Sequence, residues 1–143
     1  MRNLKLCCIG TLPLWVGVIL NSILTVLPIP VYFFSIAFLV LWGWLCRKCC
    51  ARQESIVKQA LYLSLFGFAM LALVLLQELI LGRYWVSYFG LATQLYFMPG
   101  LALFGVFLTP FMEQIVTWPI YLVEMIGLFL TALLGCWLKC RKK

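Results

Sequence analysis

The fold is decided by the uncharged stretch Leu6–Cys46, which reads LCCIGTLPLWVGVILNSILTVLPIPVYFFSIAFLVLWGWLC. As one helix at about 1.5 Å per residue it would be roughly 60 Å long, twice the roughly 30 Å hydrocarbon core of a bilayer. The stretch must therefore fold back. We expect the reversal at Leu-Pro-Ile-Pro, residues 27–30, because proline lacks an N–H and disfavours helix in the residue before it. Asn21–Ser22 is a weaker alternative. The predicted crossings cover about 6–27, which Pro13 could kink, and about 29–45.

The composition of the whole chain also indicates a membrane protein. Of its 143 residues, 66% are hydrophobic and only 10% are charged, and the mean hydropathy is +1.10. Soluble domains carry about 25% charged residues, so this chain cannot cover its surface with polar groups. It has no His, which excludes bis-His haem, Ser-His triads and His-containing zinc sites. We therefore expect no enzyme activity and no cofactor, and we interpret the net charge of +7 as topology information rather than as nucleic-acid binding.

Two more crossings and their orientation follow from the remaining apolar runs and from the basic residues. Residues 46–55 form a polar loop, and apolar runs over about 56–81 and 115–138 are long enough for a third and a fourth crossing. Positive charges beside spans favour the cytoplasmic side, which predicts that both termini and the 46–55 loop are cytoplasmic. All basic residues except Arg83 fall in three clusters: Arg2 and Lys5; Arg47, Lys48, Arg52 and Lys58; and Lys139, Arg141, Lys142 and Lys143.

We expect the segment 84–112 to lie on the outer side of the membrane without crossing it. All three basic clusters can face the cytoplasm only if the number of membrane crossings is even. Pro99–Gly100 divides this segment into two apolar arms of about a dozen residues, each too short to span. The segment is predicted to be a re-entrant hairpin or a surface-lying helix pair that turns at Pro99 and Gly100. The resulting fold class is all-α integral membrane: one domain of four transmembrane helices in two hairpins. No cleavage site follows the first apolar run, so we expect that run to be retained.

The seven cysteines all lie beside the basic clusters and therefore on the predicted cytoplasmic face, where thiols stay reduced and structural disulfides are not expected. Three interpretations remain open. Juxtamembrane cysteines suit reversible palmitoylation. The C-x-x-C at 46–49, with two C-terminal cysteines, could form a thiolate metal or redox site, but a lone C-x-x-C is weak and no metal is predicted. Cysteine can also be a small hydrophobe at helix ends. The candidate acylation sites are Cys7, Cys8, Cys46, Cys49, Cys50, Cys136 and Cys140.

Glu124 is the candidate functional acid, because a charge at the bilayer centre costs at least about 2.5–3.5 kcal/mol. It shares a helical face with Gly127, Thr131 and Gly135, whose four-residue spacing allows another helix to approach closely. We expect Glu124 to be protonated, hydrogen-bonded to another helix, or matched by a cation from a partner or a transported ion. A separate outer polar cluster is predicted to form an interfacial ion pair that orders the outer loop. Its members are Glu78, Arg83 and Glu113.

Three functions are compatible with these features. The first is a non-enzymatic protein that binds another integral membrane protein through helix–helix contacts, as an accessory subunit, an assembly or trafficking factor, or an immunity or exclusion factor. The second is a small oligomeric transporter or channel that uses Glu124 and the Pro99–Gly100 element. The third is lipid-surface anchoring or membrane shaping by the first helical hairpin. A pore needs polar residues on more than one helix, and the first two helices offer almost none. This scarcity favours the first function, binding of another membrane protein. The expected partners are lipids and either another membrane protein or further copies of this chain, but not nucleic acid.

Overall fold

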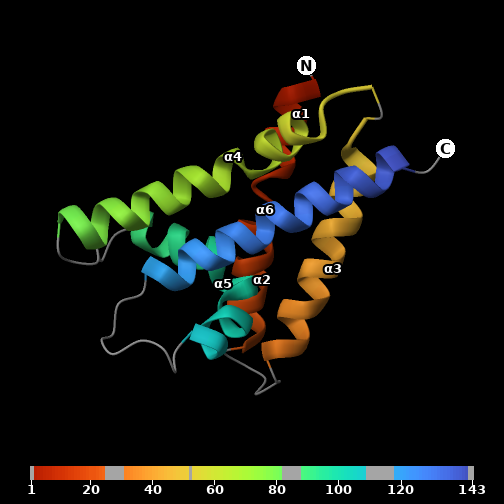
Figure 1. The fold of residues 1–143 in the computed structure, drawn as a ribbon. Coiled ribbons are helices and arrows are strands. Elements are labelled where there is room, and N and C mark those ends of the chain that lie inside the picture. The colour runs from red at the N-terminus through yellow and green to blue at the C-terminus, as the bar shows by residue number, and fades with distance from the viewer. Residues whose placement is uncertain (1, 25–30, 52, 82–87, 109–117, 142–143) are drawn as a thin grey trace.

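The computed structural model describes residues 2–24, 31–51, 53–81, 88–108 and 118–141, and within these ranges the chain is helical with no strand (Figure 1). A π-helix, η1, directly continues the fourth α-helix. The elements are α1 (Arg2–Ile9), α2 (Leu12–Leu24), α3 (Val31–Cys49), α4 (Ile56–Leu75), η1 (Leu76–Ile80), α5 (Tyr88–Leu108) and α6 (Trp118–Arg141).

Four helical stretches are long and apolar enough to cross a membrane, as the apolar runs predict. They are Asn3–Leu24, Tyr32–Cys49, Ile56–Ile80 and Trp118–Arg141. The all-helical fold with four such helices is therefore confirmed, and the expected boundaries agree to within a few residues. The side of the membrane on which the termini lie stays a prediction.

The first stretch is broken, but before Pro13 rather than at it. α1 ends at Ile9, and the chain turns through Gly10 and Thr11, where the Thr11 hydroxyl donates to the Cys8 carbonyl at 2.8 Å. Pro13 then lies in the first turn of α2, where a missing N–H costs nothing because that turn has no intrahelical acceptor for it. The proline therefore starts a helix here instead of bending one.

α3 runs four residues past its expected end at 45, so Cys46 and Cys49 belong to this helix and not to the predicted 46–55 loop. The connection to α4 is correspondingly short, and Gln59 holds it in place. The Gln59 side chain is fully buried, accepts from the Ala51 N–H at 2.6 Å, and donates to the Ala51 and Glu54 carbonyls at 3.0 and 3.1 Å. One amide thus satisfies three backbone groups of the connection between α3 and α4.

The prediction of two arms joined at Pro99 and Gly100 is wrong, because residues 88–108 form one helix, α5, with Pro99 inside it. Proline inside a helix removes one backbone hydrogen bond and crowds the carbonyl four residues earlier. In membrane proteins neighbouring helices often satisfy the groups released in this way. α5 has such neighbours, since it packs against α2, α3 and α6.

α6 lies in the middle of the bundle, with α3 on one side, α4 on the other and α5 beneath them in the view of Figure 1. The core between these helices is rich in aromatic rings: Phe97 makes an edge contact with Tyr96 at 5.0 Å between centroids and a tilted contact with Tyr121 at 5.2 Å. The Trp42 indole N–H of α3 donates to the Leu128 carbonyl of α6 at 3.2 Å. The Phe97–Tyr121 contact thus joins α5 to α6 one helical turn before Glu124, and the Trp42 hydrogen bond joins α3 to α6 one turn after it.

Candidate functional site

Glu124 and Gly100, which the sequence presents as separate features, meet at the centre of the bundle. The side chain of Glu124 is 0% exposed, and its Oε1 accepts a hydrogen bond from the Gly100 N–H at 3.0 Å. A Cβ atom on Gly100 would lie 2.8 Å from the Glu124 Cδ, closer than real Cβ contacts occur. Only glycine therefore allows the carboxyl group to reach the α5 backbone.

Pro99 explains why α5 presents backbone groups to its neighbours at this point. Its ring crowds the Leu95 carbonyl, which would otherwise accept from the residue at position 99. That carbonyl packs directly onto Gly17 of α2, and the next N–H along the chain, that of Gly100, donates to Glu124. Two neighbouring helices thus accommodate the irregular turn of α5, as membrane helices with internal prolines require.

The second oxygen of Glu124 has no such partner. Within the described part of the chain, Oε2 is buried and accepts no hydrogen bond, and the Ser64 hydroxyl and both side-chain polar atoms of Gln77 are likewise buried without a partner. We call Ser64, Gln77 and Glu124 the inner polar row. Leaving such a group unsatisfied costs about 1–3 kcal/mol, so buried polar atoms of this kind commonly mark a place for water, an ion or a functional proton.

The inner polar row is divided between the Ile56–Ile80 stretch and α6. Ser64 and Gln77 both lie on the buried face of the Ile56–Ile80 stretch, about 20 Å apart along the axis at about 1.5 Å per residue. Gln77 belongs to the π-helix, an irregularity that is frequent at functional sites. Glu124 comes from α6, which packs along α4. Unpaired polar groups therefore occur at two levels of the Ile56–Ile80 stretch and at one position on α6.

A small pocket includes Tyr121, which lies one helical turn before Glu124 on α6, and its lining combines three polar with four apolar residues. It has a volume of about 230 Å³ and lies between α2, α5 and α6. Asn21, Gln94 and Tyr121 supply its polar groups, and each comes from a different helix. We call it the Asn21 pocket. The sequence contains a signal for it, because amides inside apolar runs are rare, but the pattern around Asn21 suggests only an alternative reversal point.

Glu78 of the predicted outer polar cluster serves as a cap for α6. Its Oε2 accepts from the Trp118 N–H at 2.7 Å, at the first residue of that helix. A carboxylate there satisfies a free N–H and complements the positive end of the helix dipole. Arg83 and Glu113 lie outside the described residues, so the predicted ion pair stays a prediction.

The small residues of α6 are used inside the chain. A side chain on Gly127 would collide with the Phe104 ring of α5, and one on Gly135 would collide with the α3 backbone at Gly43. Thr131 donates its hydroxyl hydrogen to the Gly127 carbonyl at 2.7 Å, and its methyl group faces Gly43. Other helices therefore do approach this face of α6 closely: α5 at Gly127 and α3 at Gly135.

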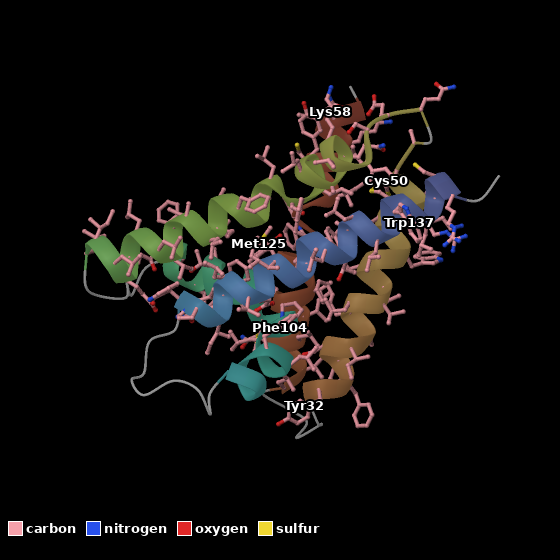
Figure 2. The ribbon with its side chains drawn as sticks, in the orientation of Figure 1. Tyr32, Cys50, Lys58, Phe104, Met125 and Trp137 are labelled. Carbon is pink, nitrogen blue, oxygen red and sulfur yellow. A yellow bond between two sulfur atoms is a disulfide. The ribbon has the colours of Figure 1, made fainter. Side chains whose placement is uncertain are left out.

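The expectation of reduced thiols is contradicted at one pair, since Cys50 and Cys136 form a disulfide that joins the end of α3 to α6. Figure 2 shows Cys50 at the end of the bundle where these two helices meet. Both residues are buried and bonded, so they are not acylation sites, and the Cys46 thiol is also fully buried. Their pairing across 86 residues depends on how α3 crosses α6, which no spacing in the sequence reveals.

The other cysteines stay candidates for acylation: Cys8 is exposed, and Cys7, Cys49 and Cys140 are half-buried. The thiolate metal site that combined 46–49 with the C-terminal cysteines is not formed. Cys136 is in the disulfide, and no group of three or more potential metal ligands is present among the described residues.

Counting alkylated thiols tests the disulfide directly. We expect five cysteines to react with iodoacetamide when the purified protein is denatured without reductant, and all seven after reduction. Intact mass spectrometry measures both numbers. The Cys140→Ser variant is the matched control, because it should lose one reactive thiol in each state and keep the difference of two. Seven alkylated cysteines without reductant would contradict the bond.

No family model, curated protein or solved structure matches this chain. Its function is therefore inferred from the geometry described above: a buried carboxyl group with one bonded and one free oxygen, two further unpaired polar side chains, and a pocket that Asn21, Gln94 and Tyr121 help to line.

Proposed function

We propose that the protein is a small oligomeric transporter or channel for protons or a small monovalent cation, in which Glu124 takes up the ion. The observation that carries this proposal is the asymmetry of its carboxyl group. Oε1 is held by the Gly100 N–H, and Oε2 is buried without a partner among the described residues. A carboxyl group fixed on one side and free on the other can receive a proton or a cation without moving the helices.

The inward-facing polar groups also support transport. The scarcity of polar residues on the first two helices speaks against a pore when the sequence is considered alone. In the folded chain Asn21 and Gln94 line one pocket with Tyr121 of α6, and Ser64 and Gln77 lie buried on a further helix. Substrate and ion sites in transporters commonly use irregular helices near the middle of the membrane. α5 is irregular at Pro99, next to the Gly100 that binds Glu124, and η1 is a π-helix at the end of the Ile56–Ile80 stretch.

Binding of another integral membrane protein is the second candidate function. The sequence supports it through a Glu that a partner would satisfy, but one oxygen of Glu124 is bonded within the chain. The remaining support is an apolar groove of about 270 Å³ between α2 and α3, beside an α3 face on which Phe33 and Val40 are 71% and 67% exposed. A stoichiometric foreign subunit that co-purifies in mild detergent would favour this candidate.

For orientation, we propose that both termini and the short α3–α4 loop face the cytoplasm, because the basic clusters lie at that end. The Cys50–Cys136 bond lies at the same end, although disulfides are typical of oxidising compartments. Both half-cystines are almost completely buried, and reduction requires a thiolate to reach one of the sulfurs. Burial therefore protects the bond from reduction at this end of the bundle.

Ion flux into liposomes tests the proposed function. The full chain is reconstituted into liposomes that contain a trapped pH dye, and a potassium diffusion potential drives proton entry. In parallel samples, trapped sodium or potassium indicators replace the dye and report entry of those ions. We expect flux from the wild type and only the level of protein-free liposomes from Glu124→Gln, because an amide cannot take up a proton or balance a cation.

Glu78→Gln is the matched control for the flux measurement. It also removes one carboxylate, but glutamine keeps an oxygen that can accept from the Trp118 N–H, so the helix cap survives. Flux should therefore be close to that of the wild type. Equal flux from the wild type and Glu124→Gln, or no flux above empty liposomes for any of the three ions, would contradict the proposal.

A further inference from the structure

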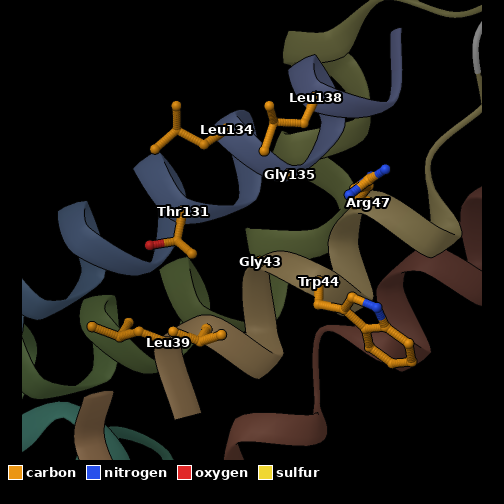
Figure 3. Close-up of a pocket in the computed structure, with 9 residues that line it drawn as sticks. Leu39, Gly43, Trp44, Arg47, Thr131, Leu134, Gly135 and Leu138 are labelled. Atoms are coloured by element: carbon orange, nitrogen blue, oxygen red, sulfur yellow. The ribbon is translucent and has the colours of Figure 1, made fainter. Parts of the chain in front are cut away.

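A third cavity lies between α3 and α6, and Glu124 is not among the residues that line it. It is a groove of about 430 Å³, within the range of sites that hold small ligands. Figure 3 shows Arg47 at one end of the groove, beyond Gly135, and Leu39 and Thr131 toward the other end. We call it the Arg47 groove.

The shape of the groove follows from the small residues that form its floor. α3 and α6 approach closely because position 135 carries no side chain: a Cβ atom there would collide with the Gly43 carbonyl and lie 2.9 Å from the Cys46 Cβ. Thr131 turns its hydroxyl to the Gly127 carbonyl and leaves only its methyl group toward Gly43. The floor is thus apolar and lacks large side chains. Exposed leucines flank it, so an alkyl chain could lie along it.

The chemistry at the end of the groove is cationic. Arg47 is half-buried, and within the described residues no carboxylate pairs with it. The neighbouring Lys48 lies over the Trp44 ring at 5.2 Å, and Arg141 lies over the Trp137 ring at 5.0 Å. Those two cations have aromatic partners, whereas the Arg47 guanidinium offers five N–H donors to an anion that the described part of the chain does not supply.

We propose that the Arg47 groove binds an anionic phospholipid, with one acyl chain along the Gly43–Thr131 floor and the phosphate at Arg47. Arginine pairs with phosphate through two parallel hydrogen bonds, and basic pockets between membrane helices bind anionic head groups. A hydrophobic helix from a partner protein would cover the floor of the groove but leave the Arg47 guanidinium unpaired. A zwitterionic lipid would bring a second positive charge next to that guanidinium. This site is independent of the proposed transport function.

Native mass spectrometry of the full chain with added dioleoyl phosphatidylglycerol or dioleoyl phosphatidylcholine tests the proposal. We expect the wild type to retain phosphatidylglycerol preferentially, and Arg47→Gln to bind it about tenfold more weakly, the loss expected for one charge-assisted pair. Lys48→Gln removes the same charge one residue away, outside the groove, and should change binding less than about twofold.

A second pair of variants tests the groove without changing charge. Leu134 and Leu130 are both exposed residues of α6, at 58% and 52%, but only Leu134 lines the groove. We expect Leu134→Trp to fill the groove and displace phosphatidylglycerol, and Leu130→Trp to leave binding unchanged. Equal losses in Arg47→Gln and Lys48→Gln would indicate only general surface charge and overturn the proposal. No preference for phosphatidylglycerol, or a second protein chain bound in place of lipid, would also overturn it.

Discussion

Replacing Gly17 with leucine is expected to prevent α2 from packing against α5. The Leu95 carbonyl lies so close to Gly17 that a Cβ would overlap it, and the Leu95 carbonyl carbon would be 2.7 Å from that Cβ. The obstacle is backbone rather than a side chain that could rotate away, so the two helices must separate. Overpacking typically costs about 1–3 kcal/mol, and a collision with backbone belongs at or above the upper end of that range.

Thermal unfolding of the detergent-solubilised protein, followed by size-exclusion chromatography, measures this effect. Gly105→Ala on α5 is the matched control, because a Cβ there meets nothing within 4 Å. That variant should be neutral or stabilised by up to about 1 kcal/mol, the helix preference of alanine over glycine. If Gly17→Leu unfolded at the same temperature as Gly105→Ala, the described α2–α5 contact would be wrong.

The Gly100→Ala variant is expected to destabilise the protein when Glu124 is present but not when Glu124 is replaced by alanine. In the wild type the new methyl group would displace the Glu124 carboxyl and break its hydrogen bond with the α5 backbone, which should cost about 1–3 kcal/mol of stability. In a Glu124→Ala background the carboxyl is absent. There the same methyl group meets no obstacle from residue 124, and the helix preference for alanine should make it neutral or stabilising by up to about 1 kcal/mol.

A double-mutant cycle of unfolding free energies measures this coupling, because the difference between the two backgrounds isolates the interaction of positions 100 and 124. The same liposomes used for flux give a second readout. Gly100→Ala with Glu124 intact should lose ion flux, since the displaced carboxyl is no longer held in position. An identical stability change in both backgrounds would show that the two residues do not interact.

The number and the approximate limits of the four long helices can be predicted because the bilayer thickness restricts how far an apolar run can extend. The predicted reversal at Pro28 and Pro30 lies outside the described residues, so its position stays a prediction. The same reasoning fails at Pro99, where a local rule predicts a break. The contacts that keep α5 continuous come from Gly17 and Glu124, on helices that are distant in the sequence.

The candidate site is partly visible in the sequence. Glu124 is evident because an acid inside an apolar helix is rare, and Gly100 is evident beside Pro99, but only the crossing of α5 and α6 brings them together. Gln77 is missed by sequence reasoning, although an amide deep in an apolar run is an available signal. The Cys50 disulfide has no signal at all, because its partner is fixed by helix packing and not by spacing.

The hydrogen bond between Gly100 and Glu124 is the feature on which both the fold of α5 and the proposed ion site depend. The chain has only ten glycines, so ¹⁵N-glycine labelling gives a simple amide spectrum, in which the Gly100 signal is identified by its loss in Gly100→Ala. We predict a downfield Gly100 amide proton in the wild type that moves upfield in Glu124→Leu and stays in place in Glu78→Gln. A Gly100 signal that is unchanged by Glu124→Leu would contradict the hydrogen bond and the ion site built on it.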